Sequence, residues 1–419
     1  MPQNTAQSSA EEAQPSFKPY EGKADSPWEE LARDRARCPV AHSKVLESIQ
    51  VTEYEAVKEV NRNHGAFSST YSATWPLEEP VPEEMQVFIL SDPPRHTRQR
   101  RLVVKALSAS RVARMRPFTE RVVNDLIDAI AGQGGAFDLG AEFAVPMSEA
   151  HITELLGIPE DDRAYFLRMS HRFQESTATI NREGIASAAM EEWRRHLLDA
   201  VRSRREAGPE SDDLITQLCF AEEEDGDRFD ENEIALIIMG LIAGTSFTAS
   251  AVVNIACTLE QHPEQKAKYT GDIDGLTSSL VEEGLRYDGP IFGLYRMTLK
   301  EAEIGHGVTA RPGDRIYFSL GAANHDPEVY DRPDEFIIDR DWKNLPSHLA
   351  FGHGAHHCLG MNLGRLQAEV ALATLYRRLP GLRIRPGFQP VQVPGPIMRA
   401  WGALEMTYDG PVRPRTDAA

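Results

Sequence analysis

The sequence predicts one large, mainly α-helical domain with a small β-rich lobe. Helical hydrophobic periodicity prevails from residue 108 to 218 and again from 231 to 259, and alternating strand patterns follow at residues 302–304 and 315–319. No stretch rich in Gly, Ser or Pro separates these parts as a linker would. A chain of 419 residues is long enough for two or three domains, but the missing linker favours a single one.

Charge and cysteine content exclude several function classes. Acidic residues outnumber basic residues by 64 to 45, and the formal net charge of −19 disfavours nucleic acid as a partner. The four cysteines are far apart and form no disulfide framework, which is typical of a reducing compartment. No apolar run has the length of a membrane span, and the polar N-terminus lacks a signal-peptide core. We therefore expect a cytoplasmic protein without a membrane or nucleic-acid partner.

The N-terminal part predicts two short helices and an irregular segment. Helical patterns occur at residues 28–37 and 54–63, with an extended stretch beginning at residue 37. Residues 67–86 are rich in Pro and Glu and show no period, which is typical of a lid or binding loop. The polar first residues are expected to be disordered. The expected divisions of the chain are an N-terminal tail at 1–27, one domain at 28–410 and a C-terminal tail at 411–419.

A basic helix is predicted over residues 91–101. Asp92 is expected to cap it, with two prolines in its first turn. His96 and Arg100 are four residues apart and therefore share one face of the helix. A solvated basic surface is the ordinary interpretation of such a run. The remaining arginines fall largely on other faces and are expected to be free: Arg95, Arg98 and Arg101.

Helical patterns continue through the middle of the chain. They cover residues 112–130, 141–156, 160–172, 188–206 and 212–219, before a charged loop at 222–225. Apolar residues at helical spacing usually form the core, although some of them here are candidates for a substrate pocket. These candidates are Tyr165, Phe166, Phe173 and Ile180.

The longest helical pattern covers residues 231–259. It is apolar nearly all round, which predicts a buried central helix. Polar residues from Glu231 to Glu233 close the apolar stretch at one end, so we do not expect a membrane span. Ala243 and Gly244 lie near its centre, where small side chains would let a ligand approach the backbone.

The C-terminal third predicts a helix, several strands and a final helix. Glu283 and Arg286 lie one turn apart in a helix at 278–287, a pairing that is common on exposed helices. An apolar run then ends at Arg296, as in a buried strand that reaches the surface. The later elements are the turn at 311–314 between two strands, the helix at 363–379 and a β-rich tail.

The strongest candidate for a functional site is a glycine-rich loop with one cysteine, Phe351-Gly-His-Gly-Ala-His-His-Cys358-Leu-Gly360. Three glycines within these ten residues and a helical pattern after them indicate a tight loop that delivers one sulfur to a helix N-terminus. There the helix dipole and free N–H groups would favour a thiolate, which suits a metal that needs one soft ligand; haem iron is the leading candidate. The alternatives are a small buried hydrophobic residue and a zinc site, although the spacing is not that of structural zinc. Zinc would draw on His353, His356, His357 and Cys358.

The pattern Phe351-Gly-x-Gly-x-His356-x-Cys358-x-Gly360 resembles the haem-binding signature of the cytochrome P450 superfamily in its soluble bacterial form. The resemblance covers about residues 28–408 and implies the cytochrome P450 fold. It implies that Cys358 is the proximal ligand of the iron in haem b and that Phe351 and Gly360 belong to the cofactor-binding loop. The implied ligands of the haem propionates are His96, Arg100, Arg296 and His356. A structural lock is implied for Glu283, Arg286 and Arg340.

The predicted central helix departs from this family. After Ala-Gly the family usually has any residue, an acid, a threonine and another hydroxyl residue, whereas this chain has Thr245, Ser246, Phe247 and Thr248. Phe247 cannot deliver a proton in place of the threonine, and Ser246 replaces the acid. Three explanations are open. In the first, a helix bulge moves Thr248 or Ser246 into place to deliver protons. In the second, a hydroxyl or carboxylate of the substrate organises the water that delivers them. In the third, the enzyme takes electrons or peroxide by another route.

The resemblance implies a monooxygenase that uses O₂ and electrons from NAD(P)H, delivered by a ferredoxin- or flavodoxin-type partner. It would hydroxylate or O-demethylate a small, mainly apolar substrate, aromatic compounds and natural products included. The arginine cluster of the basic helix would suit an acidic donor at a proximal basic face. The alternatives are a peroxygenase or oxidative-coupling enzyme of the same fold, and a haem-binding protein without activity. The expected pocket residues are Phe247, Ile291, Phe292, Leu294, Ile397 and Met398.

Overall fold

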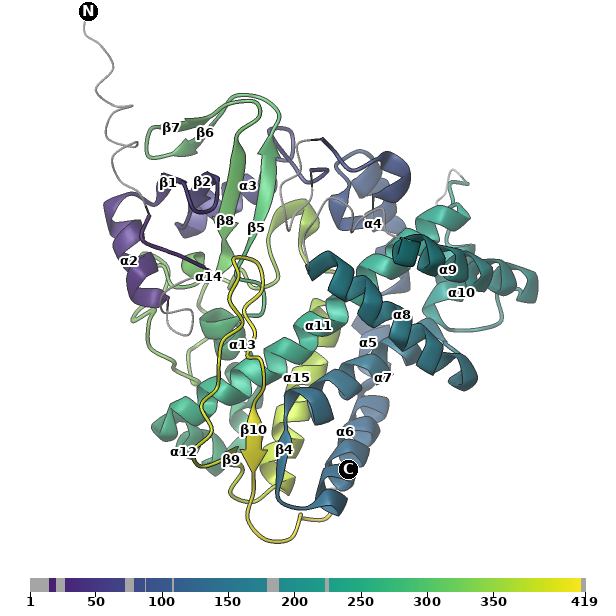
Figure 1. Cartoon of the computed structure of the whole chain (residues 1–419), viewed down its shortest axis with the longest axis vertical. Coiled ribbons are helices and arrows are strands. Elements are labelled where there is room, and N and C mark those ends of the chain that lie inside the picture. The colour runs from purple at the N-terminus through teal and green to yellow at the C-terminus, as the bar shows by residue number, and fades with distance from the viewer. Residues whose placement is uncertain are drawn as a thin grey trace, which may run out of the picture.

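Helices form the larger part of the molecule, and a five-stranded sheet lies beside them at one corner (Figure 1). A computed structural model of the protein describes residues 15–19, 27–71, 79–86, 88–107, 109–178, 188–222 and 226–415. The arrangement confirms the expected mainly α fold with a small β-rich lobe.

The helices lie close to the positions that the hydrophobic periodicity predicts. Their bounds are α2 Trp28–Arg37, α3 Tyr54–Arg62, α4 Arg95–Ala106, α5 Ala109–Arg114, α6 Arg116–Gln133, α7 Val145–Leu156, α8 Glu160–Ala178, α9 Ala188–Ala207, α10 Leu214–Phe220, α11 Glu231–Gln261, α12 Pro263–Gly271, α13 Ile273–Asp288, α14 Leu320–Ala323 and α15 Met361–Arg378. Single turns are η1 Glu83–Met85, η2 Phe88–Leu90, η3 Gly140–Ala144 and η4 Gly354–His356.

Two predicted helices are divided in the structure. The helix expected at 112–130 is split into α5 and α6, and the one expected at 141–156 begins as the π-helical turn η3 before α7. In both cases a proline, Pro117 or Pro146, stands in the first turn of the second helix. Because proline has no N–H, the helical hydrogen-bond ladder cannot run through these positions without interruption.

Three sheets make up the β structure. The five-stranded sheet has the order β1-β2-β8-β5-β3, in which β2 and β8 are parallel and the other neighbours are antiparallel. Its strands are β1 Val40–Ser43, β2 Ser48–Val51, β3 Phe67–Ser68, β5 Gly293–Thr298 and β8 Arg315–Ser319. The smaller sheets contain β4 Ala136–Asp138, β10 Glu405–Thr407 and β9 Arg383–Ile384, and the hairpin of β6 Ala302–Gly305 and β7 Val308–Ala310.

The long helix α11 runs through the centre of the helical part (Figure 1). Asp230 begins it with a capping box, since its carboxylate accepts from the N–H of Glu233 and the Glu233 side chain reaches back to the N–H of Asp230. Among the described residues α11 is the one helix long and apolar enough to cross a membrane. Here it packs against α7, α9, α13 and α15, so protein covers its apolar surface as a central core helix requires.

Parts of both expected tails pack against the domain. Phe17 is 4% exposed and lies on α2, where the N–H of Ser16 donates to the Asp34 carboxylate. At the other end, the Arg415 guanidinium pairs with Asp125 and Asp128 of α6. The expectation of a disordered tail therefore does not hold for residues 15–19, and residues 411–415 are docked to a helix.

Candidate functional site

The cysteine loop is held by backbone contacts that require glycine. Gly352 and Gly354 have φ of 70° and 71°, and a Cβ on Gly354 would lie 2.6 Å from the backbone oxygen of Asn61 in α3. The N–H of Cys358 donates to the backbone oxygen of Phe351 at 2.9 Å, which closes the loop. Cys358 is accessible to solvent although protein surrounds its sulfur, and α15 begins directly after Gly360. The loop thus presents one sulfur beside a helix N-terminus, as the sequence predicts.

The protein alone does not favour a thiolate at this position. Burial raises the pKa of the Cys358 thiol, while the N–H groups of Gly360 and Met361 and the charges of Arg100 and Arg365 act in the opposite direction. The predicted effect of the helix terminus is present, but burial outweighs it. A bound metal cation would reverse the balance, because a coordinating thiol loses its proton. Within the described ranges no three His, Cys, Asp or Glu side chains group as a metal site, so the four nominal zinc ligands do not converge.

Four cationic or imidazole side chains from three elements converge next to the cysteine loop. The ring of His96 on α4 lies 4.0 Å from the ring of His356 and stacks on Phe88 at 4.7 Å. Burial, followed by the charges of Arg296, His96 and Arg100, lowers the pKa of His356 to about 2. Burial and the charges of Arg100 and Arg296 lower the pKa of His96 to about 4. Both rings are therefore neutral at pH 7, and the two arginines carry the positive charge.

Several nitrogens of this cluster are buried and have no hydrogen-bond partner among the described residues. They are Nδ1 and Nε2 of His96, Nδ1 of His356 and Nη1 of Arg100. Arg296 is 4% exposed, and its Nη1 donates to the neighbouring Tyr295 oxygen. Buried polar groups are almost always satisfied, and an unsatisfied one costs about 1–3 kcal/mol. The cluster therefore has the donors and the charge that a ligand with buried carboxylates requires.

Glu283, Arg286 and Arg340 form the contact that the resemblance implies. Two nitrogens of Arg286 donate to the two carboxylate oxygens of Glu283 at 2.8 Å each, and Nε of Arg340 donates to one of them at 3.1 Å. Glu283 and Arg286 are 0% and 1% exposed, and Arg286 also donates to three backbone oxygens. A buried ion pair is stable when all its polar atoms are satisfied, as here. The three residues join α13 to the segment that precedes the cysteine loop.

The middle of α11 is less tightly packed than its two ends. Ile242 and Ala249 are buried, whereas the residues between them are partly or fully exposed. No atom outside the adjacent backbone lies within 4 Å of a Cβ built on Gly244. The expected small-residue site at Ala243 and Gly244 is thus open to a ligand.

The hydroxyl groups near Phe247 bond back to their own helix. Oγ of Ser246 donates to the oxygen of Ala243 at 3.1 Å, and Oγ1 of Thr248 donates to that of Gly244 at 3.4 Å. The helix is continuous from residue 231 to 261, so the bulge that would move these hydroxyls is not present. Ser148 of α7 donates to the Thr245 oxygen at 2.8 Å and anchors this turn.

The expected pocket residues divide into two groups. Phe292 and Ile397 are buried in the core, where the Phe292 ring lies 5.2 Å from that of Phe17. Ile291 and Met398 form an antiparallel bridge and are partly exposed, as is Leu294. Phe292 and Ile397 pack with Phe17 in the N-terminal core, and the assignment of these residues to the pocket stays a prediction.

The candidates from the middle helices are in part core residues. Phe166 is fully buried, with its ring 5.7 Å from that of Trp193, and Tyr165 packs edge-on against His196. Phe166 is therefore a core residue, as apolar residues at helical spacing usually are. The Phe173 side chain and Ile180 lie outside the described residues, as do residues 72–78 of the expected lid.

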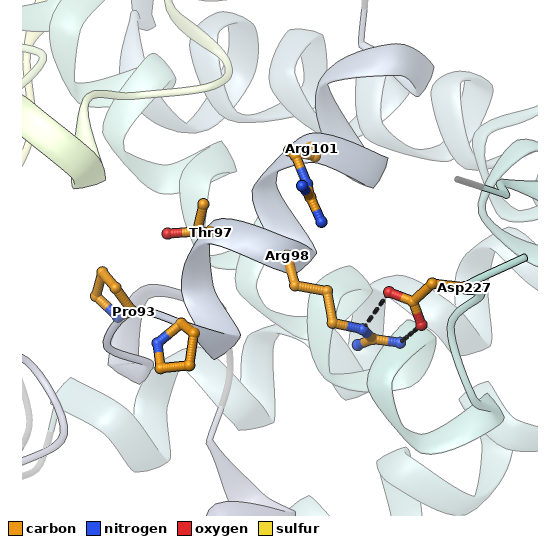
Figure 2. Close-up of a pocket in the computed structure, with 6 residues that line it drawn as sticks. Pro93, Thr97, Arg98, Arg101 and Asp227 are labelled. Atoms are coloured by element: carbon orange, nitrogen blue, oxygen red, sulfur yellow. Dashed lines mark hydrogen bonds and ion pairs between the residues drawn. The ribbon is translucent and has the colours of Figure 1, made fainter. Parts of the chain in front are cut away.

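The structure corrects two expectations about the basic helix. The Asp92 carboxylate does not cap α4, since it accepts from Oγ of Ser68 and from the N–H of Ser69. Arg98 is not free: Figure 2 shows its guanidinium paired with Asp227, at 2.6 and 2.9 Å, beside an open surface pocket. Arg98 also donates to Glu233 at 2.6 Å. Arg95 pairs with Glu83 at 2.8 Å, whereas Arg101 lines the pocket in Figure 2.

The structure also places cationic side chains of α3 at the cysteine loop, which the sequence analysis did not identify. The charges of Lys58 and Arg62 on α3 act on His353, together with burial, to lower its pKa. Arg62 is 51% exposed, and His64 directly after α3 is also exposed. The contact of Gly354 with Asn61 holds this end of α3 against the loop. Nothing in the linear order pairs α3 with a loop almost three hundred residues later.

Comparisons with known proteins agree with this geometry. The family model described as "Cytochrome P450" matches residues 44–380. The cytochrome P450 monooxygenase PikC of Streptomyces venezuelae is 33% identical over 393 residues, which cover 92% of each chain. The 20-oxo-5-O-mycaminosyltylactone 23-monooxygenase of Streptomyces fradiae is 32% identical over 395 residues, covering 92% of this chain and 89% of the relative. The crystal structure of CalO2 superposes with a TM-score of 0.83 at 28% identity, covering 94% and 99% of the two chains.

The same family is indicated by the cysteine loop, by the helical fold and by these relatives. The model match spans well over half of the chain, and the relatives are named as monooxygenases. The chain belongs to the cytochrome P450 family of monooxygenases.

Proposed function

We propose that Cys358 ligates the iron of haem b and that His96, Arg100, Arg296 and His356 hold its propionates. The unpartnered buried nitrogens of His96, His356 and Arg100 support this assignment, because two propionates would satisfy them and neutralise the two arginines. When bound, the haem supplies the activation of O₂, and the thiolate ligand promotes O–O cleavage. The protein contributes orientation, proton supply and exclusion of water.

The proposed reaction is hydroxylation or O-demethylation of a small, mainly apolar compound of natural-product type. Support comes from the open stretch of α11 at Gly244 and from the partly exposed Ile291, Leu294 and Met398. The relative from Streptomyces fradiae is named for a glycosylated tylactone, which fits this substrate class. Phe247 narrows the site and offers a face for aromatic stacking.

We infer that the substrate helps to hold the water that supplies protons for O–O cleavage. The replacement of the usual acid and threonine by Ser246 and Phe247 supports this, because both nearby hydroxyls bond back to helix carbonyls. A hydroxyl or carboxylate on the substrate would hold water where the protein side chains do not.

The proposed electron donor is a ferredoxin- or flavodoxin-type protein that takes its electrons from NAD(P)H. We assign its docking surface to the end of α3 beside the cysteine loop, where Arg62 and His64 are exposed. Arg98 and Arg95 are less accessible to a partner, since their side chains are 28% and 20% exposed, against 51% for Arg62, which pairs loosely with Glu59 of its own helix at 3.6 Å. An acidic donor would be steered to this side by charge. We also place the protein in the cytoplasm, where such donors operate.

A peroxygenase or oxidative-coupling reaction is the second candidate. The observation that favours it is the same distal pair, Ser246 and Phe247, because peroxide brings its own protons and makes a relay less important. Full turnover with peroxide alone would support this candidate. Consumption of one O₂ per NADH with a reconstituted ferredoxin, coupled to product, would exclude it. The relatives are named as monooxygenases, which argues against a haem-binding protein without activity.

The ligand assignment is tested by the spectrum of the reduced CO complex. Replacement of Cys358 with Ala or His should abolish the red-shifted absorbance that thiolate ligation produces. Retention of that band in Cys358→Ala would refute Cys358 as the ligand. Replacement of Cys257, a buried cysteine of α11, with Ala is the matched control and should leave the band in place.

A further inference from the structure

A short polar segment after β3 reaches the cluster beside the cysteine loop. Ser69 is 1% exposed, and its Oγ lies 3.1 Å from Nε2 of His356. The N–H of the same residue donates to Oδ1 of Asp92 at 2.9 Å. Ser69 therefore connects the cysteine loop to the segment that precedes α4.

Asp92 contacts α4 and the segment after β3, and its charge acts on Arg296 of β5. Its backbone oxygen accepts from the N–H of His96 at 3.0 Å, and its carboxylate holds Ser68 and Ser69. Ser68 pairs across the sheet with Met297, the residue after Arg296. The negative charge of Asp92 acts on Arg296, where it opposes the effect of burial on the pKa of that guanidinium. Asp92 is thus placed to fix the spacing between α4, β5 and the cysteine loop.

The contact of Ser69 with Nε2 leaves Nδ1 as the nitrogen of His356 without a partner among the described residues. A neutral imidazole has one donor and one acceptor nitrogen, and the partner of one nitrogen sets the role of the other. If the Ser69 hydroxyl donates to Nε2, the proton of the ring lies on Nδ1. Nδ1 is the buried nitrogen of His356 that has no partner among the described residues. It would then be a donor, which is what a carboxylate ligand requires.

We propose that Ser69 and Asp92 are positioning residues for the cofactor carboxylates. Ser69 donates to His356 so that Nδ1 presents its hydrogen to a haem propionate, and Asp92 holds Ser69 in place and balances part of the charge of Arg296. The inference rests on the proposed function, because the carboxylate is that of haem.

The test compares haem loss from three variants of the full-length holoenzyme. Ser69→Ala should transfer haem to excess apomyoglobin roughly two- to tenfold faster than the wild type, the effect of one hydrogen bond. Ser69→Thr keeps the hydroxyl and should restore a rate near that of the wild type. Thr52→Val is the matched control, because the buried Thr52 hydroxyl donates to the backbone oxygen of Pro39 and has no contact with Ser69 or Asp92. An unchanged rate in Ser69→Ala, or an equal increase in Thr52→Val, would overturn the proposal.

Two spectroscopic readouts separate positioning from a general loss of structure. The resonance Raman band of propionate bending should shift in Ser69→Ala and stay in place in Ser69→Thr. Asp92→Asn removes a negative charge near the haem and should make its reduction potential more positive; an unchanged potential and band would refute the role of Asp92. Wild-type protein that binds no haem would refute the proposed function itself. A haem-bound wild type with the same rate as every variant would refute this inference alone.

Discussion

Removal of the Arg98 side chain should loosen the attachment of α4 to α11. In the structure Arg98 pairs with Asp227, donates to the nearly buried Glu233 and also donates to the backbone oxygen of residue 228. We expect Arg98→Met to lower the free energy of unfolding by about 2–3 kcal/mol. About 1 kcal/mol of this comes from the partly exposed pair with Asp227, and about 2 kcal/mol from the charge-assisted bond to Glu233. Because α4 carries His96 and Arg100, haem loss should also accelerate.

The assay is equilibrium urea unfolding of the holoenzyme, followed by far-UV circular dichroism and haem absorbance. Arg101→Met is the matched control on the same helix and should change the stability by less than about 0.5 kcal/mol, as is usual for a surface substitution. The pH dependence provides a further check. Arg98 holds the pKa of the Asp227 carboxylate below its usual value, so this stabilisation is present at neutral pH and is lost as the pH falls below about 4. The difference between wild type and Arg98→Met should therefore shrink in acid. Equal costs for Arg98→Met and Arg101→Met would refute the reasoning.

Two further predictions concern proton supply and electron supply. Phe247→Thr should raise the fraction of NADH consumption that is coupled to product for poorly functionalised substrates, because it returns a hydroxyl to the distal helix; unchanged or lower coupling would contradict the proposed role of the substrate. Arg62→Glu should slow reduction by ferredoxin several-fold at low ionic strength, with the difference shrinking at high salt. Arg195→Glu, a 68% exposed arginine on the distant helix α9, is its control and should leave the reduction rate unchanged.

Local sequence signals were sufficient for most of the fold. The hydrophobic periodicity placed α2, α9 and α11 within a few residues of their observed ends, because burial of one face or of the whole surface leaves its period in the sequence. It failed at Pro117 and Pro146, where the apolar pattern continues across a break in the backbone hydrogen bonds. Periodicity records which side of a helix is buried and does not record where its hydrogen bonds stop.

The partners of charged side chains were much harder to predict. The sequence predicts Arg98 to be a free cation on a basic helix. The acids that it binds lie about 130 residues later: Asp227 in the segment before α11, and Glu233 in the first turn of α11. The sequence predicts Asp92 to be a helix cap, yet its carboxylate accepts hydrogen bonds from Ser68 and Ser69, at the end of β3 and directly after it. The ion pairs depend on contacts between distant segments, which a single sequence does not encode in any local pattern. The same holds for Phe292 and Ile397, whose orientation toward Phe17 depends on where the N-terminal segment packs.

The sequence by itself determined that this protein presents one sulfur from a glycine-rich loop. Glycines, one cysteine and a following helix within a short run specify a loop that presents a single sulfur, and this information is local because the loop folds on itself through the bond between Cys358 and Phe351. Only the tertiary structure decided which residues surround that sulfur. His96, Arg296 and His356 come from a helix, a strand and a loop, and only packing brings them to one place, where buried nitrogens of His96 and His356 have no partner among the described residues. Burial makes those nitrogens costly without a ligand, and burial is a property of the folded chain.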